Sequence, residues 1–221
     1  MHPGEAGFPR HLHWKNAFLF PIETPEARRD VLIGGTLILL LWPIGWVLNL
    51  GNRLNVVARL HAGQSPYFTG FRPWRLTLRR GCVSAAAIAA YLSPAAALGA
   101  FAYVAYAKAA APLLVAPLGA ASAAAFVLAV FTLPGCMTVY AVEGDAAVLR
   151  NPAGAFRRAW SRRRVYLRAW AIALASVSLS FVGALGVLIG FLYASVWSWD
   201  VVGYAFTVAM YAPAAEPRSD R

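Results

Sequence analysis

Charged side chains are scarce in this sequence. Asp, Glu, Lys and Arg make up 13% of the 221 residues, whereas an ordinary soluble domain carries roughly 25%. Four long stretches contain no Asp, Glu, Lys, Arg or His at all, namely residues 31–50, 81–107, 109–142 and 169–199. Because an uncharged apolar run of about 18 or more residues is typical of a membrane span, these stretches exclude a soluble enzyme.

Histidine and cysteine are also sparse. The four histidines all lie outside the uncharged stretches, so no axial haem ligand is expected inside a helix bundle. His11 and His13 without a third ligand make a weak metal site. Cys82 and Cys136 belong to no CxxC or Cys/His cluster, which favours packed thiols. The sequence therefore predicts no metal and no cofactor.

Catalytic constellations are missing as well. The serines of the uncharged stretches have no His or Lys near them in the sequence, so helix packing is their expected role. Glu143 and Asp145 are two residues apart and would face different directions on a helix. Lys108 and Asp200 lie at the edges of the expected spans, which argues against an ion relay through the bundle. We therefore predict that the protein is not an enzyme.

The uncharged stretches predict an all-α integral membrane protein with four transmembrane helices. The first, residues 31–50, would be about 30 Å long as one helix and kinked by Pro43 and Gly45. Residues 201–212 are too short to cross comfortably, so a re-entrant, an interfacial or a bundle-packed segment is expected there. The other spans are expected at residues 81–106, 119–140 and 169–194.

The two ends of the chain are polar. Residues 1–30 carry charges throughout and no apolar core, which argues against a cleavable signal peptide and favours a short interfacial segment. Thr24-Pro25-Glu26 is a good helix start, with Thr as the N-cap and Pro in the first turn. Residues 213–221 are predicted to be a polar tail.

The cations are almost all arginine, and they cluster. The formal net charge is +11, and 18 of the 20 cations are Arg. Residues 51–80 and residues 143–168 together hold 13 of them, which by the positive-inside rule places both connectors in the cytoplasm and both termini outside. These basic clusters adjoin the expected spans, so anionic lipid is the expected partner and nucleic acid is not.

Two sets of residues are candidate contact sites. Gly183, Gly186 and Gly190 would allow close helix packing, within the chain or against a partner subunit. The connector arginines stand among aromatic residues and would contact lipid head groups or a partner, although topology control with nonspecific lipid contact is the plainer interpretation. These arginines are Arg72, Arg75, Arg79, Arg80, Arg157, Arg158, Arg162, Arg163, Arg164 and Arg168.

The two connectors resemble each other. The second span is preceded by Phe71-Arg72-Pro73-Trp74, and the fourth is preceded by a similar stretch from Phe156 to Trp160. The matching phenylalanines and tryptophans are 85 and 86 residues apart. Two helical hairpins of the same orientation, each with a basic cytoplasmic connector, would explain this repeat. Chance is the alternative, because Arg and aromatic residues are common at membrane interfaces.

A wider resemblance rests on the first connector. The stretch from Gly51-Asn52-Arg53 through Gly63 and Pro66 to Gly81 resembles a bacterial and archaeal membrane family, domain of unknown function number four thousand and thirteen. Asn52 stands where that family usually has an aromatic residue. The resemblance implies a multi-pass protein of the bacterial or archaeal plasma membrane, without an assigned activity or catalytic residue.

Two functions fit these observations. The first is a non-enzymatic accessory, scaffold or assembly subunit of a larger membrane complex, as the small-residue helix faces and the absence of buried titratable groups suggest. The alternative is a small transporter or lipid-handling protein whose arginines select anionic head groups.

Overall fold

The computed structural model describes residues 11–64, 70–108, 112–183 and 188–212, and within these ranges the chain is helical with no strand. The predicted all-α class is confirmed. The elements are α1 (Trp14–Leu19), η1 (Phe20–Ile22), α2 (Pro25–Leu41), α3 (Ile44–His61), α4 (Trp74–Ala107), α5 (Pro112–Glu143), η2 (Ala146–Arg150), α6 (Pro152–Ser161), α7 (Arg163–Val182) and α8 (Leu188–Tyr211).

Helices α2 and α3 form an antiparallel hairpin. Helix α2 begins as its sequence suggests, because the Thr24 hydroxyl accepts a hydrogen bond from the Ala27 amide at 3.1 Å. At the other end of the hairpin, α2 stops at Leu41 and α3 starts at Ile44, after Pro43. Asn49 on α3 donates its side-chain amide to the Gly34 carbonyl on α2 at 3.0 Å.

This hairpin corrects the prediction of one kinked span over residues 31–50. Proline lacks the amide hydrogen that would continue the helix of α2. Gly45, with no Cβ, lets the start of α3 lie directly against the backbone of Leu37, where any larger residue would clash. The chain therefore turns back on itself where a kink was expected.

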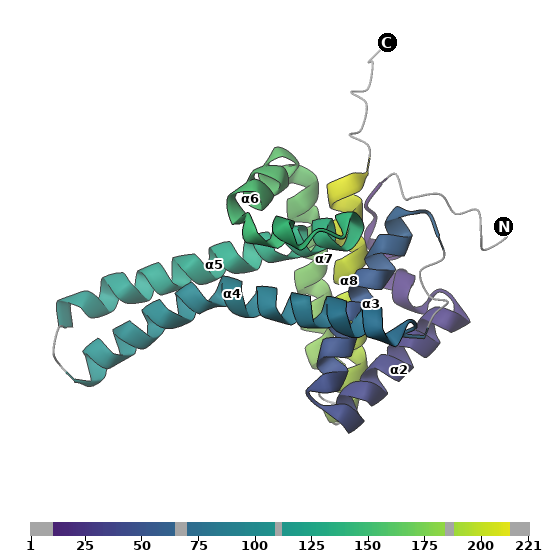
Figure 1. The fold of residues 1–221 in the computed structure, drawn as a ribbon, viewed down its shortest axis with the longest axis horizontal. Helices are drawn as coiled ribbons and strands as arrows, with labels where there is room; N and C mark the ends of the chain where they lie inside the picture. Colours follow the sequence, from purple (N-terminus) through teal and green to yellow (C-terminus); the bar gives the residue numbers. More distant parts are fainter. Residues whose placement is uncertain (1–10, 65–69, 109–111, 184–187, 213–221) are drawn as a thin grey trace, which may run out of the picture.

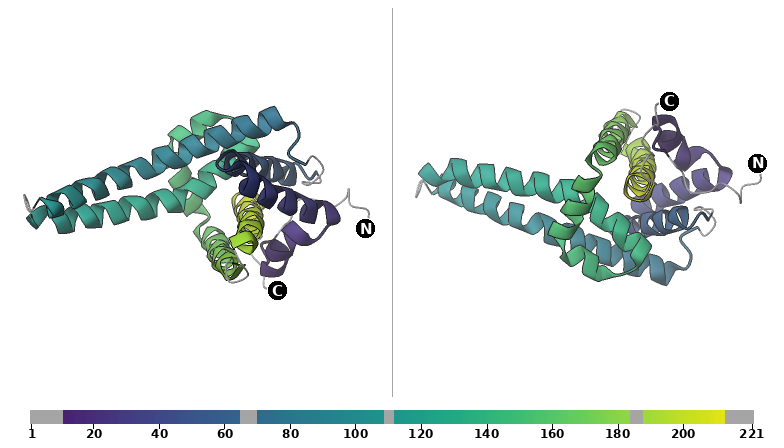
Figure 2. Two further views of the ribbon diagram at one scale, coloured as in Figure 1. Left: turned by 90° about the horizontal axis from the view of Figure 1, so that it is seen from below. Right: turned by 90° about the horizontal axis from the view of Figure 1, so that it is seen from above.

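Helices α4 and α5 form a longer hairpin that projects away from the rest of the molecule (Figures 1 and 2). They contain the predicted spans 81–106 and 119–140, and α5 continues helically through Pro117. The Ser122 hydroxyl donates to the Ala95 carbonyl at 2.8 Å and ties the two helices together. Large apolar side chains of the far part, such as Phe101 and Leu113, are exposed.

Helices α7 and α8 form the third hairpin and cross the direction of α4 and α5 (Figure 1). The predicted fourth span, residues 169–194, is divided between them, because α7 ends at Val182 and α8 begins at Leu188. Residues 201–212 lie in the protein core, where Val201, Phe206 and Val208 are fully buried. Of the three expected outcomes for this segment, packing against the bundle is the one observed.

In the part of the chain that the structure describes, three helices, α4, α5 and α7, are long and apolar enough to cross a membrane. The most apolar windows of α4 and α5 are only 11% and 6% buried by the rest of the protein. Apolar surface on this scale is not stable in water, so the helices indicate a membrane protein. The four-span arrangement predicted from the sequence is not observed, since the first and fourth predicted spans are each divided between two helices.

Candidate anion-binding site

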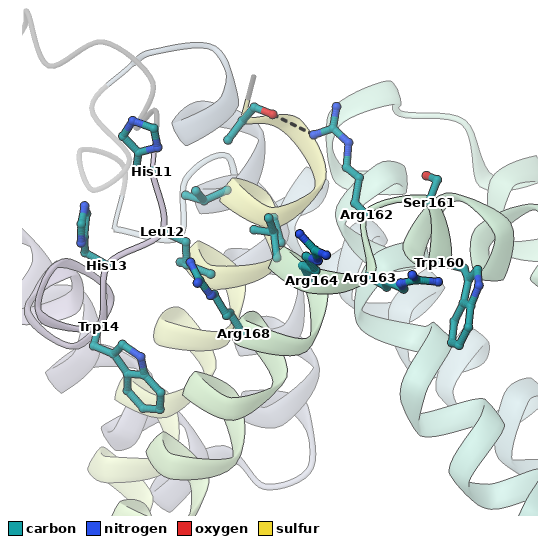
Figure 3. A pocket seen from close by; sticks show the side chains of 14 residues that line it. His11, Leu12, His13, Trp14, Trp160, Ser161, Arg162, Arg163, Arg164 and Arg168 are labelled. Carbon is teal, nitrogen blue, oxygen red and sulfur yellow. Dashed lines mark hydrogen bonds between the residues drawn. The ribbon is translucent and has the colours of Figure 1, made fainter. Parts of the chain in front are cut away.

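A hollow of about 1150 Å³ opens where three parts of the chain meet (Figure 3). These parts are the segment before and at the start of α1, the junction of α6 and α7, and the end of α8. Its lining residues include four arginines, two histidines and two tryptophans, and none of them is acidic. The lining residues are His11, Leu12, His13, Trp14, Trp160, Ser161, Arg162, Arg163, Arg164, Val165, Arg168, Val208, Ala209 and Ala212.

The helix junction explains why the arginines gather here. Helix α6 ends at Ser161 and α7 begins at Arg163. Arg162 lies between them and is both the C-cap of α6 and the N-cap of α7. Tyr166 is fully buried one turn later and donates its hydroxyl to the Phe131 carbonyl on α5 at 2.6 Å. This anchored tyrosine fixes the first turn of α7, and with it the neighbouring arginines.

Two of the four arginines are already engaged by the protein. The Arg162 guanidinium donates to the Ala212 carbonyl at 2.8 Å, just beyond the C-terminus of α8 (Figure 3). A cation at this position satisfies a free carbonyl and complements the helix dipole. The Arg163 guanidinium lies over the Trp160 ring, 6.0 Å from its centroid.

Arg164 and Arg168 are exposed and remain free for a ligand. They are four residues apart on α7, so they share a face of the helix and repel each other. In the described ranges, Arg158 and Glu143 form the only salt bridge, at 3.0 Å, and neither residue lines the hollow. An anion held between Arg164 and Arg168 would relieve this repulsion.

The other predicted contact arginines are distributed over the surface. Arg157 on α6 and Arg72 and Arg79 near the start of α4 are exposed. Arg75 lies over the Trp74 ring at 5.5 Å. Arg80 donates to the Asn55 side-chain carbonyl at 2.9 Å, so it joins α4 to α3.

A smaller crevice of about 160 Å³ lies at the first connector. Arg59, Arg72 and Arg80 line it together with Asn55 and Gln64. Both arginine-rich connectors thus contribute to a basic depression, but only the second forms a hollow that is large enough for a lipid head group.

The predicted glycine contact lies within the chain. A Cβ atom built on Gly183 would lie 3.0 Å from the Gly190 carbonyl oxygen, so the end of α7 approaches the start of α8 closely at this pair. Gly186 lies outside the described residues. These two glycines therefore pack one helix of the hairpin against the other.

A buried polar cluster was missed by the sequence reasoning. Asp30 on α2, Asn52 and Arg53 on α3, and Asp200 on α8 come together in the core, where Asn52 and both carboxyl groups are buried. Asn52 hydrogen-bonds to Asp30, and the Arg53 guanidinium donates to the Met137 sulfur on α5 at 3.0 Å. Asp200 was expected at an interfacial exit. The polar residues of α3 recur at helical spacing from residue 49 to residue 55, which is the one signal that pointed to this cluster.

Burial governs the protonation of this cluster. Desolvation raises the pKa of Asp200 to about 7, a rise to which the nearby Asp30 contributes and which Arg53 opposes. Desolvation likewise raises the pKa of Asp30 to about 6 against the hydrogen bond from Asn52. The pKa of Arg53 falls to about 10 because of its burial, against the attraction of Asp200.

The described ranges contain no group of three or more His, Cys, Asp or Glu side chains that could hold a metal ion. The hollow at the α6–α7 junction is lined by arginines and bordered by tryptophans, so it is suited to an anion.

No known protein family, no curated protein and no solved structure matches this chain, so the resemblance noted in the first connector stays a prediction.

Proposed function

We propose that this protein is a non-enzymatic membrane protein whose hollow at the α6–α7 junction binds the phosphate-bearing head group of an anionic lipid. One observation carries the proposal. Among the described residues, four arginines and no acid line a hollow large enough for a head group, and Arg164 and Arg168 within it have no ion-pair partner.

The position of the hollow along α7 supports a lipid ligand. Arg168 is the last charge of α7, and Ala169 to Val182 are uncharged, so the arginines stand at the level where this helix would enter hydrocarbon. Trp14 and Trp160, both about half exposed, border the hollow. Tryptophan favours the head-group region, and guanidinium groups bind phosphate oxygens in pairs.

A binding titration tests the proposal. The detergent-purified protein is titrated with short-chain phosphatidylglycerol or phosphatidylcholine, and tryptophan fluorescence reports binding. Each arginine near an anionic group contributes roughly 1 kcal/mol, so the double variant Arg164→Gln, Arg168→Gln is expected to weaken phosphatidylglycerol binding about 30-fold. The variant Arg150→Gln, Arg157→Gln removes the same charge from exposed positions outside the hollow and should bind like wild type.

Two results would overturn the proposal. One is equal affinity of the wild-type protein for phosphatidylglycerol and phosphatidylcholine. The other is equal weakening by both double variants, which would show that overall charge rather than the hollow governs binding. Titration with inorganic phosphate separates a free anion from a lipid, because a head-group site that also uses the aromatic border should prefer the lipid.

A second candidate is an accessory subunit of a larger membrane complex. The exposed face of the α4–α5 hairpin includes many alanines, such as Ala96, Ala97, Ala123 and Ala124, which would let a partner helix approach closely. The mass of the particle extracted from native membranes in mild detergent tests this candidate. A partner at fixed stoichiometry would support it, and a lone 23.8 kDa chain or a homo-oligomer would argue against it.

A further inference from the structure

The tip of the α2–α3 hairpin is apolar and uncovered. Leu40 and Trp42 are 71% and 70% exposed, and Leu39, Leu41 and Ile44 beside them are about half exposed. These five residues, here called the hairpin tip, lie in the middle of the 22 uncharged residues between Asp30 and Arg53. We propose that α2–α3 is a re-entrant hairpin whose tip lies among the acyl chains of one leaflet, without crossing the bilayer.

The lengths of the two arms support a partial insertion. In α2, 11 uncharged residues separate Asp30 from the turn, and in α3, nine residues run from Ile44 to Arg53, counting Ile44. At 1.5 Å per residue, the two arms reach about 16 Å and 14 Å beyond these charges. The hydrocarbon core is about 30 Å thick, so each arm reaches roughly halfway.

Two polar side chains inside the hairpin have hydrogen-bond partners, as burial in hydrocarbon requires. Asn49 is buried and donates to the carbonyls of Gly34 and Gly45, at 3.0 Å and 2.7 Å. The Thr36 hydroxyl donates to the Leu32 carbonyl at 2.9 Å. Its oxygen is also 3.0 Å from the Tyr193 hydroxyl of α8. Asn49 and Thr36 would therefore not be left unpaired when the hairpin enters the membrane.

The charges at the base match the expected membrane surface. At the base of α2, Arg28 and Arg29 are exposed and so are Glu23 and Glu26, while Arg59 lies toward the end of α3. Charged side chains of both signs at the base and apolar side chains at the tip are the arrangement of a hairpin that enters a membrane from its surface. A soluble partner would have to cover five large apolar side chains, and no charge at the tip would orient it.

The fold-back also fixes the sidedness of the chain. Because α2 and α3 are antiparallel, the residues that precede α2 and those that follow α3 lie on the same side of the bilayer. A true span over residues 31–50 would place them on opposite sides.

Single-cysteine variants of the whole protein in sealed vesicles test the proposal. Cys82 and Cys136 are first replaced by Ala, and a monodisperse elution profile in detergent establishes that this background folds. Ile22→Cys before α2, Gln64→Cys after α3 and Trp42→Cys at the tip are then made one at a time. All three parent side chains are exposed. A membrane-impermeant maleimide probes sidedness, and a fluorophore on residue 42 is quenched with lipids that carry a spin label at a known depth.

The proposal predicts that positions 22 and 64 react from the same side and that the impermeant reagent does not reach position 42 from either side. Acyl-chain spin labels should quench the fluorophore at position 42 more strongly than head-group labels. Reaction of positions 22 and 64 from opposite sides would overturn the proposal and establish a span. Shielding of position 42 from both the reagent and the spin-labelled lipids would also overturn it, because a second copy or another protein would then cover the tip.

Discussion

Replacing Asp200 with Asn should make the stability of the protein much less dependent on pH. The pKa of Asp200 rises from 3.8 to about 7 in the folded protein, and the pKa of Asp30 rises to about 6. The folded state therefore keeps these protons at a pH where the unfolded chain has lost them. Stability is greatest at low pH and falls as the pH rises from about 4 through 7.

The magnitude follows from the two shifts. One pKa unit corresponds to about 1.4 kcal/mol. Between about pH 5 and about pH 8, Asp200 accounts for a loss of roughly 2.6 kcal/mol and Asp30 for roughly 1.4 kcal/mol. Wild type should lose about 4 kcal/mol over this range, whereas Asp200→Asn should lose only the share of Asp30. That share should itself shrink, because the repulsion between the two carboxylates is gone.

Unfolding in detergent micelles, followed by the fluorescence of the eight tryptophans, measures these differences. Glu26→Gln is the matched control, because it removes an exposed carboxylate in the first turn of α2, outside the buried cluster. Equal pH dependence in wild type and Asp200→Asn would refute the assignment of the buried cluster as the group that binds these protons.

Two further substitutions test the packing that positions the sites. Gly51→Ala should destabilise the protein by about 1–3 kcal/mol, because the added methyl would meet the Thr77 carbonyl where α3 crosses α4. Gly119→Ala, in an open stretch of α5, is the control and should be neutral or slightly stabilising. Equal midpoints of thermal unfolding for both variants would contradict the close crossing. Tyr166→Phe should lower the free energy of unfolding by about 1–2 kcal/mol, because it removes the hydrogen bond to the Phe131 carbonyl. It should also weaken phosphatidylglycerol binding, because the first turn of α7 loses its anchor. Unfolding and lipid titration of the same preparation measure both effects, and unchanged lipid affinity in a destabilised protein would show that the anchor does not position the site.

The helical class could be predicted from the sequence, and so could the two long apolar helices that contain spans 81–106 and 119–140, although the predicted hairpins paired the first span with the second and the third with the fourth, whereas α4 pairs with α5. Both depend on local quantities: apolar length, helix-compatible residues and a polar break at Lys108. The gathering of arginines at the start of α7 was visible for the same reason. The sequence did not indicate which of them would line one hollow, because His11, Trp14 and Ala212 enter it from distant parts of the chain.

The first predicted span shows what local reasoning lacks. Twenty uncharged residues can form one helix that crosses a bilayer or two helices that reach halfway, and their hydropathy is identical. Pro43 and Gly45 are compatible with a kink as well as with a turn. The difference lies in partners from far along the chain, since Gly35 packs against the Tyr193 ring and Gly34 against Val196, both on α8.

The buried cluster also depends on residues that are far apart in the sequence. A carboxylate at the edge of an apolar run is ordinarily an interfacial residue, and the sequence placed Asp200 there. In the folded chain Asp200 on α8, Asp30 on α2 and Arg53 on α3 meet at one level of the core, because α2–α3 and α7–α8 are folded-back hairpins and pack side by side. If the stretch from Asp30 to Arg53 were one straight helix, these two residues would lie about 35 Å apart and could not share a partner. The charges that bound the uncharged stretch in the sequence are thus the ones that meet where α2 and α3 pack on α8, and the pH dependence of stability follows from their burial together.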